Sequence, residues 1–273
     1  MAILAALAVA ILALDVPATA AVAEPAAMVA HGGGGVDGEP YWNSVEALER
    51  NYAAGFRVFE VDFHWTRDRK LVLLHDWKRN FRRHFKPYDP PLLRRLIARA
   101  MRRPALPPLA EFLRLGKPDG PTPTDLAGLA RWLAAHPDAR IVTDVKKHNL
   151  RALGRIAERY PELVPRFIPQ VFSFAEYAPA KALGYRYVIL TLYRTQAADN
   201  RVVAFAGRER PYAVTMPAER AARGDLARRL QSLGVFVYAH TVNDRAVLNE
   251  LAARGVNGFY TDFLGAAPAS TND

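Results

Sequence analysis

The feature that most limits the fold is the alternation of short apolar segments, rich in β-branched and aromatic residues, with longer stretches of helical periodicity. Repeated strand–helix units build a parallel sheet, because each crossover helix covers one face of the strands it connects. Eight units in one domain predict an α/β fold of the TIM (β/α)8 barrel type. The eight expected strands are residues 27–30, 57–63, 140–146, 167–172, 185–192, 212–217, 234–241 and 257–262.

The expected domain organisation is one barrel domain over residues 24–273 with an insertion. The length of 273 residues alone fits one large barrel or two ordinary domains. Residues from about 80 to 123 break the strand–helix rhythm with many prolines and arginines and a helical pattern around Leu92 to Met101. An insertion after the second strand would overhang the active face of a barrel. The sequence leaves open whether this segment is a lid, a membrane-docking element or packing.

Composition and charge restrict the function. The 37 Lys and Arg residues against 27 Asp and Glu residues give a formal charge of +10, which draws a protein toward anionic surfaces such as phospholipid headgroups or nucleic acid. The arginine clusters lack repeated stacking aromatics, so no nucleic-acid partner is expected, and solvated helix faces are the commonest use of such clusters. The absence of cysteine excludes disulfides, thiolate metal sites and cysteine nucleophiles. A bound metal must therefore use oxygen or imidazole ligands.

The first 23 residues predict a signal peptide. An apolar run is followed by the small-residue patterns "ATA" and "AVA", which suit signal peptidase cleavage before Glu24. No Lys or Arg precedes the run and Asp15 interrupts its end, both unusual for a signal peptide. A membrane anchor is the alternative, but the run from Met1 to Leu14 is shorter than the ~20 apolar residues that span a bilayer. We expect a secreted or periplasmic protein.

Polar residues stand at the ends of the first three predicted strands. His31 follows the first strand, Glu60 and Asp62 lie near the end of the second, and Asp144 and Lys146 close the third. Residues two apart on a strand point to the same face, so each pair should project together. Three carboxylates would form an oxygen cage of the kind that binds Mg²⁺ or Ca²⁺. The alternative is a strand edge facing water, which the surrounding apolar residues disfavour because they would bury these charges.

Five motifs follow one another along almost the whole chain: "AHGGG", "NSVEAL", "FEVDFHWTRDRKLVLLHDW", "IVTDVK" and "HTVNDRAVLNELAARGVNGFYTD". In this order they resemble the glycerophosphodiester phosphodiesterase family, within the superfamily of phosphatidylinositol-specific phospholipases C and spider-venom-type phospholipases D. The resemblance implies an acid/base pair, His31 and His75, and a phosphate-facing catalytic lysine, Lys146. It also implies one divalent cation held by Glu60, Asp62 and Asp144, the last at a position where many relatives carry glutamate.

Two departures from the family pattern affect substrate binding. Gly32 stands where the family's "HRG" motif has an arginine, and His240 stands where relatives commonly carry tryptophan. The glycine run 32–35 could offer backbone N–H groups to an anion or form a simple turn. His240 is expected to alter the pocket wall that contacts the alcohol part of the substrate.

Further residues have weaker indications. Asn43 either begins a helix or lies near the phosphate mouth, as the resemblance implies, and Gln170 could hold a metal-bound water or a substrate hydroxyl. His64 is expected at the rim of the site, and Asp76 as structural support for its loop. Three histidines are expected to be ordinary surface residues: His84, His136 and His148.

The leading hypothesis is a metal-dependent phosphodiester hydrolase that acts on glycerophosphodiesters or related phospholipid headgroups by histidine acid/base catalysis. Two alternatives remain at this point. One is phospholipase D-like or phosphatidylinositol phospholipase C-like activity on intact lipid, with an anionic membrane surface as a partner. The other is a barrel that binds anionic ligands without turnover. The oligomeric state is left open.

Overall fold

The computed structural model describes residues 24–102 and 104–267, and the predicted signal peptide lies outside them. Within this described part, eight parallel strands form a closed barrel, as the sequence predicts. Neighbouring strands pair in the order β1-β9-β8-β7-β6-β5-β4-β2, and β1 closes the barrel by pairing with β2. The barrel strands are β1 (Met28–Ala30), β2 (Val58–Trp65), β4 (Arg140–Val145), β5 (Phe167–Val171), β6 (Ile189–Thr191), β7 (Ala213–Pro217), β8 (Phe236–His240) and β9 (Gly258–Thr261).

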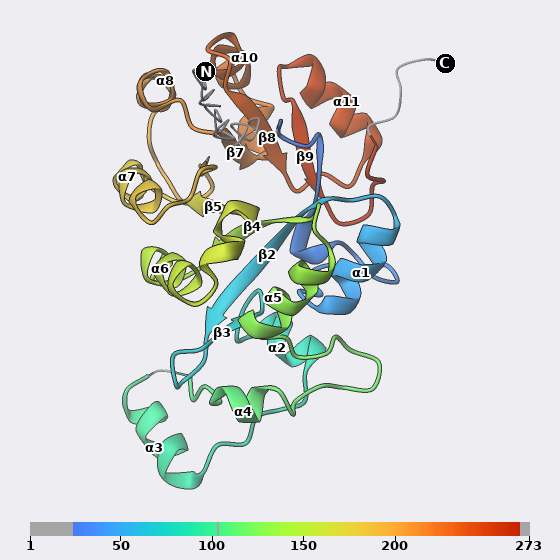
Figure 1. The fold of residues 1–273 in the computed structure, drawn as a ribbon, viewed down its shortest axis with the longest axis vertical. Helices are drawn as coiled ribbons and strands as arrows, with labels where there is room; N and C mark the ends of the chain where they lie inside the picture. The colour runs from blue at the N-terminus through green and yellow to red at the C-terminus, as the bar shows by residue number, and fades with distance from the viewer. Residues whose placement is uncertain (1–23, 103, 268–273) are drawn as a thin grey trace, which may run out of the picture.

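Helices surround the barrel and connect its strands (Figure 1). Ser44 and Asp244 accept hydrogen bonds from the first-turn amides of α1 and α11 and so cap the N-termini of these two helices. The helices next to the barrel are α1 (Val45–Ala53), α5 (Leu126–Ala135), α6 (Asn149–Arg159), α7 (Phe174–Ala182), α8 (Asp199–Glu209), α9 (Ala218–Ala221), α10 (Leu226–Ser232) and α11 (Arg245–Ala253), with short 3-10 turns η1 (His31–Gly33) and η2 (Pro161–Arg166).

The strand pleat separates two layers of side chains. On β2, Phe59, Val61 and Phe63 point outward into the core shared with the helices, while Val58 packs in a second core inside the barrel. Glu60 and Asp62 alternate with the outward residues, so they share the interior side with Val58. The apolar interior core thus lies below a polar layer that begins at Glu60.

The segment between β2 and α5 contains one strand that the sequence pattern did not reveal. β3 (Leu71–Leu73) turns back and pairs antiparallel with Phe63–Trp65 at the end of β2. Its three residues are all buried and apolar, so they show neither alternation nor a length that distinguishes a strand. Three helices follow: α2 (Arg79–His84), α3 (Leu92–Ala100) and α4 (Leu109–Phe112). In Figure 1, α3 and α4 lie beyond the C-terminal end of β2.

A small separate core holds α2 and α4 against β3, and it corrects one expectation. Phe81, Phe85 and Phe112 pack with Val72 of β3 in this core. His84 was expected at the surface, but it is 5% exposed because it lies on the inner side of α2 near Trp42. Burial lowers the pKa of His84 to about 4. Within the described residues, no helix is both long and apolar enough to cross a membrane.

Candidate metal centre and active site

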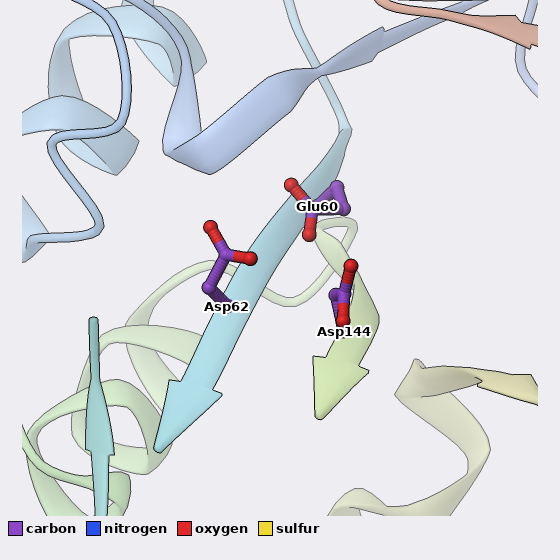
Figure 2. Close-up of side chains that lie close together, drawn as sticks. All are labelled: Glu60, Asp62 and Asp144. Atoms are coloured by element: carbon purple, nitrogen blue, oxygen red, sulfur yellow. The ribbon is translucent and has the colours of Figure 1, made fainter. Parts of the chain in front are cut away.

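Three carboxylates converge inside the mouth of the barrel. Glu60 and Asp62 project from β2, and Asp144 projects from the neighbouring strand β4, where it pairs in register with Asp62 (Figure 2). One oxygen from each carboxylate lies within 4.8 Å of the others, and all three side chains are buried. Carboxylate oxygens grouped in this way are the ligands that Mg²⁺ and Ca²⁺ prefer. The cluster therefore fits a divalent metal site.

Lys146 neutralises part of this cluster. Its Nζ donates to Asp62 Oδ1 at 2.9 Å and to Asp144 Oδ2 at 2.8 Å. Burial alone would lower the pKa of Lys146, but the two carboxylates raise it well above its ordinary value. The Tyr193 hydroxyl donates to the same Asp144 oxygen at 2.9 Å. The ammonium group thus shows that the space between these carboxylates suits a cation.

One lysine is not enough for three buried carboxylates. Burial and the nearby charge of Asp62 raise the pKa of Glu60 to about 8, so Glu60 holds a proton at neutral pH. Burial would also raise the pKa of Asp62, but Lys146 overcomes this effect and lowers it. A divalent ion together with Lys146 would supply three positive charges for three ionised carboxylates. The charge balance supports the same metal site as the geometry.

His31 lies beside the carboxylates and is held by a residue that the sequence analysis missed. It follows β1, and its Nδ1 donates to Asp262 Oδ1 at 2.9 Å, while its Nε2 lies 3.9 Å from Glu60 Oε2. Asp262 follows β9, which is next to β1 only because the barrel closes. Asn243 donates to the other Asp262 oxygen at 2.7 Å and so fixes that carboxylate. A carboxylate at the end of the last strand was the signal that could have identified Asp262.

The acid–base balance of His31 follows from these contacts. Burial by itself would lower the pKa of the imidazole. The hydrogen bond to Asp262 and the charges of Glu60, Asp262 and Asp62 outweigh burial and raise the pKa to about 9.

His75 has a similar carboxylate partner. Its Nδ1 lies 3.1 Å from Asp76 Oδ2, and Asp76 Oδ1 accepts from the amides of Lys78 and Arg79 at 2.6 Å. Asp76 therefore both supports the loop, as predicted, and orients the histidine. Tyr41 packs against both imidazoles, with ring centroids 4.9 Å from His31 and 4.3 Å from His75. No motif in the sequence indicated this tyrosine.

Asn43 contacts a candidate metal ligand. Its Nδ2 donates to Asp62 Oδ2 at 3.0 Å, and its Oδ1 accepts from the Asp62 amide at 2.8 Å. The neighbouring Ser44, rather than Asn43, caps helix α1. Asn43 thus holds Asp62 in place, and its predicted contact with substrate stays a prediction.

The glycine run forms an ordered turn. The Gly32 amide donates to Glu60 Oε2 at 2.9 Å, the Gly34 amide to the His31 carbonyl and the Gly35 amide to the Asp262 carbonyl. Gly32 has φ +58°, and a Cβ there would lie 2.9 Å from the Tyr41 Cα. The turn therefore bonds the Glu60 carboxylate through one amide and the main chain of His31 and Asp262 through two others, and a Cβ at position 32 would collide with the Tyr41 backbone.

The remaining predicted site residues lie on the barrel wall. Gln170 is buried on β5, and His240 ends β8 with its Nδ1 2.8 Å from Thr215 Oγ1. Burial, with the nearby charges of His31 and Lys146, lowers the pKa of His240 to about 3, so its ring is neutral. Burial likewise lowers the pKa of His64, the predicted rim residue, to about 4.

The two remaining histidines, His148 and His136, differ in solvent exposure. His148 is exposed, as expected. His136 was also expected at the surface, but its side chain is only 14% exposed because its ring stacks on Trp132 with centroids 4.3 Å apart.

Comparisons with known proteins support one family. The sequence model of the Glycerophosphoryl diester phosphodiesterase family matches residues 35–102, a part that contains Glu60, Asp62 and His75. This match confirms the family resemblance that the motifs predict and, with it, the predicted enzyme class of a phosphoric diester hydrolase related to this family. No curated protein matches the chain.

Solved structures of low sequence identity share the fold. A glycerophosphodiester phosphodiesterase from Parabacteroides distasonis has a TM-score of 0.66 at 17% identity, covering 88% of this chain and 93% of its own. The Thermotoga maritima enzyme gives 0.64 at 19% identity, covering 88% and 96%. An Oleispira antarctica phosphodiesterase in complex with the product sn-glycerol-3-phosphate gives 0.65 at 17% identity, covering 88% and 94%.

The raised pKa of His31 predicts how the stability of the metal-free protein depends on pH. The pKa of His31 is about 9 in the folded protein and 6.5 in the unfolded chain. Protonated His31 therefore contributes fully to the free energy of unfolding below pH 6.5, and this contribution is lost as the pH rises to 9. The loss is about 3 kcal/mol, or roughly 6 to 12 °C in melting temperature. The measurement is thermal unfolding in chelator between these pH values, with His31→Gln as the comparison. Equal pH dependence in both proteins would contradict the prediction.

Proposed function

We propose that this relative of the glycerophosphodiester phosphodiesterases is a metal-dependent hydrolase of glycerophosphodiesters or related phospholipid headgroups. The observation that carries the proposal is the placement of three buried carboxylates beside two histidines, each of which has its own carboxylate partner. Hydrolysis of a phosphodiester requires neutralisation of the phosphate charge, removal of a proton from the nucleophile and protonation of the leaving alkoxide. The site contains groups for all three tasks.

Glu60, Asp62 and Asp144 would hold one divalent cation, Mg²⁺ or Ca²⁺. When bound there, such an ion supplies charge stabilisation to a phosphate oxygen. Asn43 keeps the Asp62 carboxylate oriented, and the Gly32 amide does the same for Glu60. Lys146, held between Asp62 and Asp144, adds a positive charge for the phosphate.

His31 and His75 are proposed as the acid/base pair. In both residues Nδ1 is paired with a carboxylate, Asp262 for His31 and Asp76 for His75. This pairing fixes the tautomer and leaves Nε2 as the nitrogen that takes or gives a proton at the substrate. Each transfer contributes roughly 10²–10⁴ in rate. Tyr41 contacts both imidazole rings.

The residues on the wall of the pocket favour a particular type of substrate alcohol. His240 is neutral and buried, and its ring lies 5.7 Å from Tyr193 in an edge-to-face arrangement. Together with Gln170, it offers hydrogen-bonding groups to the alcohol part of a substrate. A polar wall of this kind favours glycerol or another hydroxylated alcohol. Intact lipid is a second candidate substrate, favoured by the exposed apolar residues of α3 on the segment beyond β2.

Removal of metal should abolish turnover, and Mg²⁺ or Ca²⁺ should restore it. The assay compares glycerophosphocholine and glycerophosphoinositol with lysophospholipid vesicles, after chelation and then with each ion added back. Glu60→Gln should lower kcat/KM at least 100-fold because it removes one ligand charge. Glu158→Gln, a change at an exposed glutamate on α6, is the matched control and should leave turnover unchanged. Full activity in chelator, or in Glu60→Gln, would contradict metal dependence.

Alanine at either histidine should lower kcat by roughly 10²–10⁴. The variants are His31→Ala and His75→Ala, and His148→Ala at an exposed position is the control. Circular dichroism and melting temperature check that each variant is folded. Tight binding of a phosphodiester without turnover, in the wild type as well as in the variants, would instead identify a non-catalytic barrel.

A further inference from the structure

Helix α3 exposes an apolar surface. None of its residues is buried, although it contains several large aliphatic side chains. Leu93 is 69% exposed and Leu92 is 64% exposed. Of the eight large hydrophobic residues that are exposed in the described part of the chain, five lie on this helix or at its C-cap: Leu92, Leu93, Leu96, Ile97 and Met101. Clustering of this kind marks an interaction surface, whereas single exposed aliphatic residues are ordinary.

The apolar and basic residues occupy opposite sides of α3. At 100° per residue, the five apolar side chains fall on one half of the helix. Arg95 lies on the other half, and Arg94 and Arg99 flank the apolar side at its two edges. A groove of about 530 Å³ runs along the apolar side, between Ile97 and Leu106. The helix thus combines an open apolar face with cationic edges.

The surrounding segment is strongly basic. Residues 79–102 contain eight Lys and Arg residues and one acidic residue, Asp89. Asp89 is near Arg95 at 3.7 Å, and both side chains are largely exposed. An exposed ion pair of this length contributes little, so most of the positive charge is available to a partner.

The position of α3 suits contact with an extended surface. Figure 1 shows it at one end of the longest axis of the molecule, beyond the C-terminal end of β2. The same strand carries Glu60 and Asp62. Because barrel active sites open at the C-terminal ends of the strands, α3 lies toward the end of the barrel where the substrate enters.

We propose that α3 docks the protein on an anionic phospholipid surface, with its leucine and isoleucine side chains in the outer acyl region and its arginines on lipid phosphates. An amphipathic helix with an apolar face and basic edges lies in the plane of such an interface. Arginine stems pack along the apolar boundary while the guanidinium groups reach the headgroups. This inference goes beyond the proposed catalytic function, since it concerns where the protein binds and not the bond that it breaks.

Charge argues against a second copy of the chain as the occupant. In a symmetric dimer the same patch of each protomer faces its equivalent, which would bring two sets of these arginines together. Only Asp89 in residues 79–102 could offset this repulsion. An anionic lipid surface, in contrast, gains from every arginine on the helix.

Vesicle sedimentation of the full chain tests the proposal. The probes are vesicles of phosphatidylcholine alone and of phosphatidylcholine mixed with phosphatidylglycerol. The wild type should bind the anionic vesicles more tightly, and added salt should weaken that binding. Replacement of Arg94, Arg95 and Arg99 by Gln should lower partitioning roughly a hundredfold. The double variant Leu93→Ser, Ile97→Ser should lower it at least about tenfold.

A site-specific label separates α3 from the rest of the chain, including the apolar residues 1–23. Because the chain has no cysteine, Leu93→Cys can be labelled alone with an environment-sensitive fluorophore. Val247→Cys, on α11 and 40% exposed, is the matched control. The label at position 93 should shift to the blue on anionic vesicles, and the label at position 247 should not. No shift at 93, or equal shifts at both positions, would overturn the proposal.

Two further readouts distinguish this proposal from the catalytic one. Turnover of soluble glycerophosphocholine should be unchanged in the Leu93 and Ile97 double variant, while any turnover of vesicle-borne substrate should fall with binding. The sedimentation and fluorescence results require no turnover, so they stand even where the catalytic proposal fails. Light scattering that shows a dimer lost in the double variant, with no vesicle binding, would assign this face to a second copy and contradict lipid docking.

Discussion

The repulsion among three buried carboxylates is the constraint on which the rest of the site depends. Glu60, Asp62 and Asp144 share one side of two adjacent strands, within reach of a single ion. Burial raises the free energy of each charged form, and each carboxylate raises it further for the others. Without added positive charge Glu60 takes up a proton, as its pKa of about 8 shows. The surrounding residues provide cationic or hydrogen-bonding groups that make this arrangement tolerable.

Each of these surrounding groups also positions a residue for chemistry. Lys146 forms ion pairs with both Asp62 and Asp144 and so holds the two carboxylates side by side. Asp262, which follows β9, bonds His31 across the β1–β9 pair, and Asn243 fixes the Asp262 carboxylate. The turn at Gly32 directs an amide to Glu60, and a Cβ at this position would meet the Tyr41 backbone. The glycine at this position therefore allows the chain to pass close to Tyr41 while its amide bonds Glu60.

The parts of this structure that depend on local sequence pattern could be predicted from the sequence. Alternation placed Glu60 and Asp62 on one face of a strand, and the repeated strand–helix rhythm predicted the barrel. Residues that meet only because distant parts of the chain pair in the barrel could not be identified from local pattern. Asp262 and His31 are 231 positions apart and meet only because β9 pairs with β1. Tyr41 and Tyr193 had no motif, and His84 appeared to belong to a surface insertion because the small core around Phe112 has no periodic signal.

The most direct test of the central claim is the location of a bound divalent ion. Crystals grown with Mn²⁺ would give an anomalous difference map that identifies the ion independently of the surrounding density. We expect one peak in contact with oxygens of Glu60, Asp62 and Asp144, and the loss of this peak in Asp144→Asn. A peak at other residues would contradict a metal site at these carboxylates. The absence of a peak at saturating Mn²⁺, with Lys146 still paired with both Asp62 and Asp144, would contradict it as well.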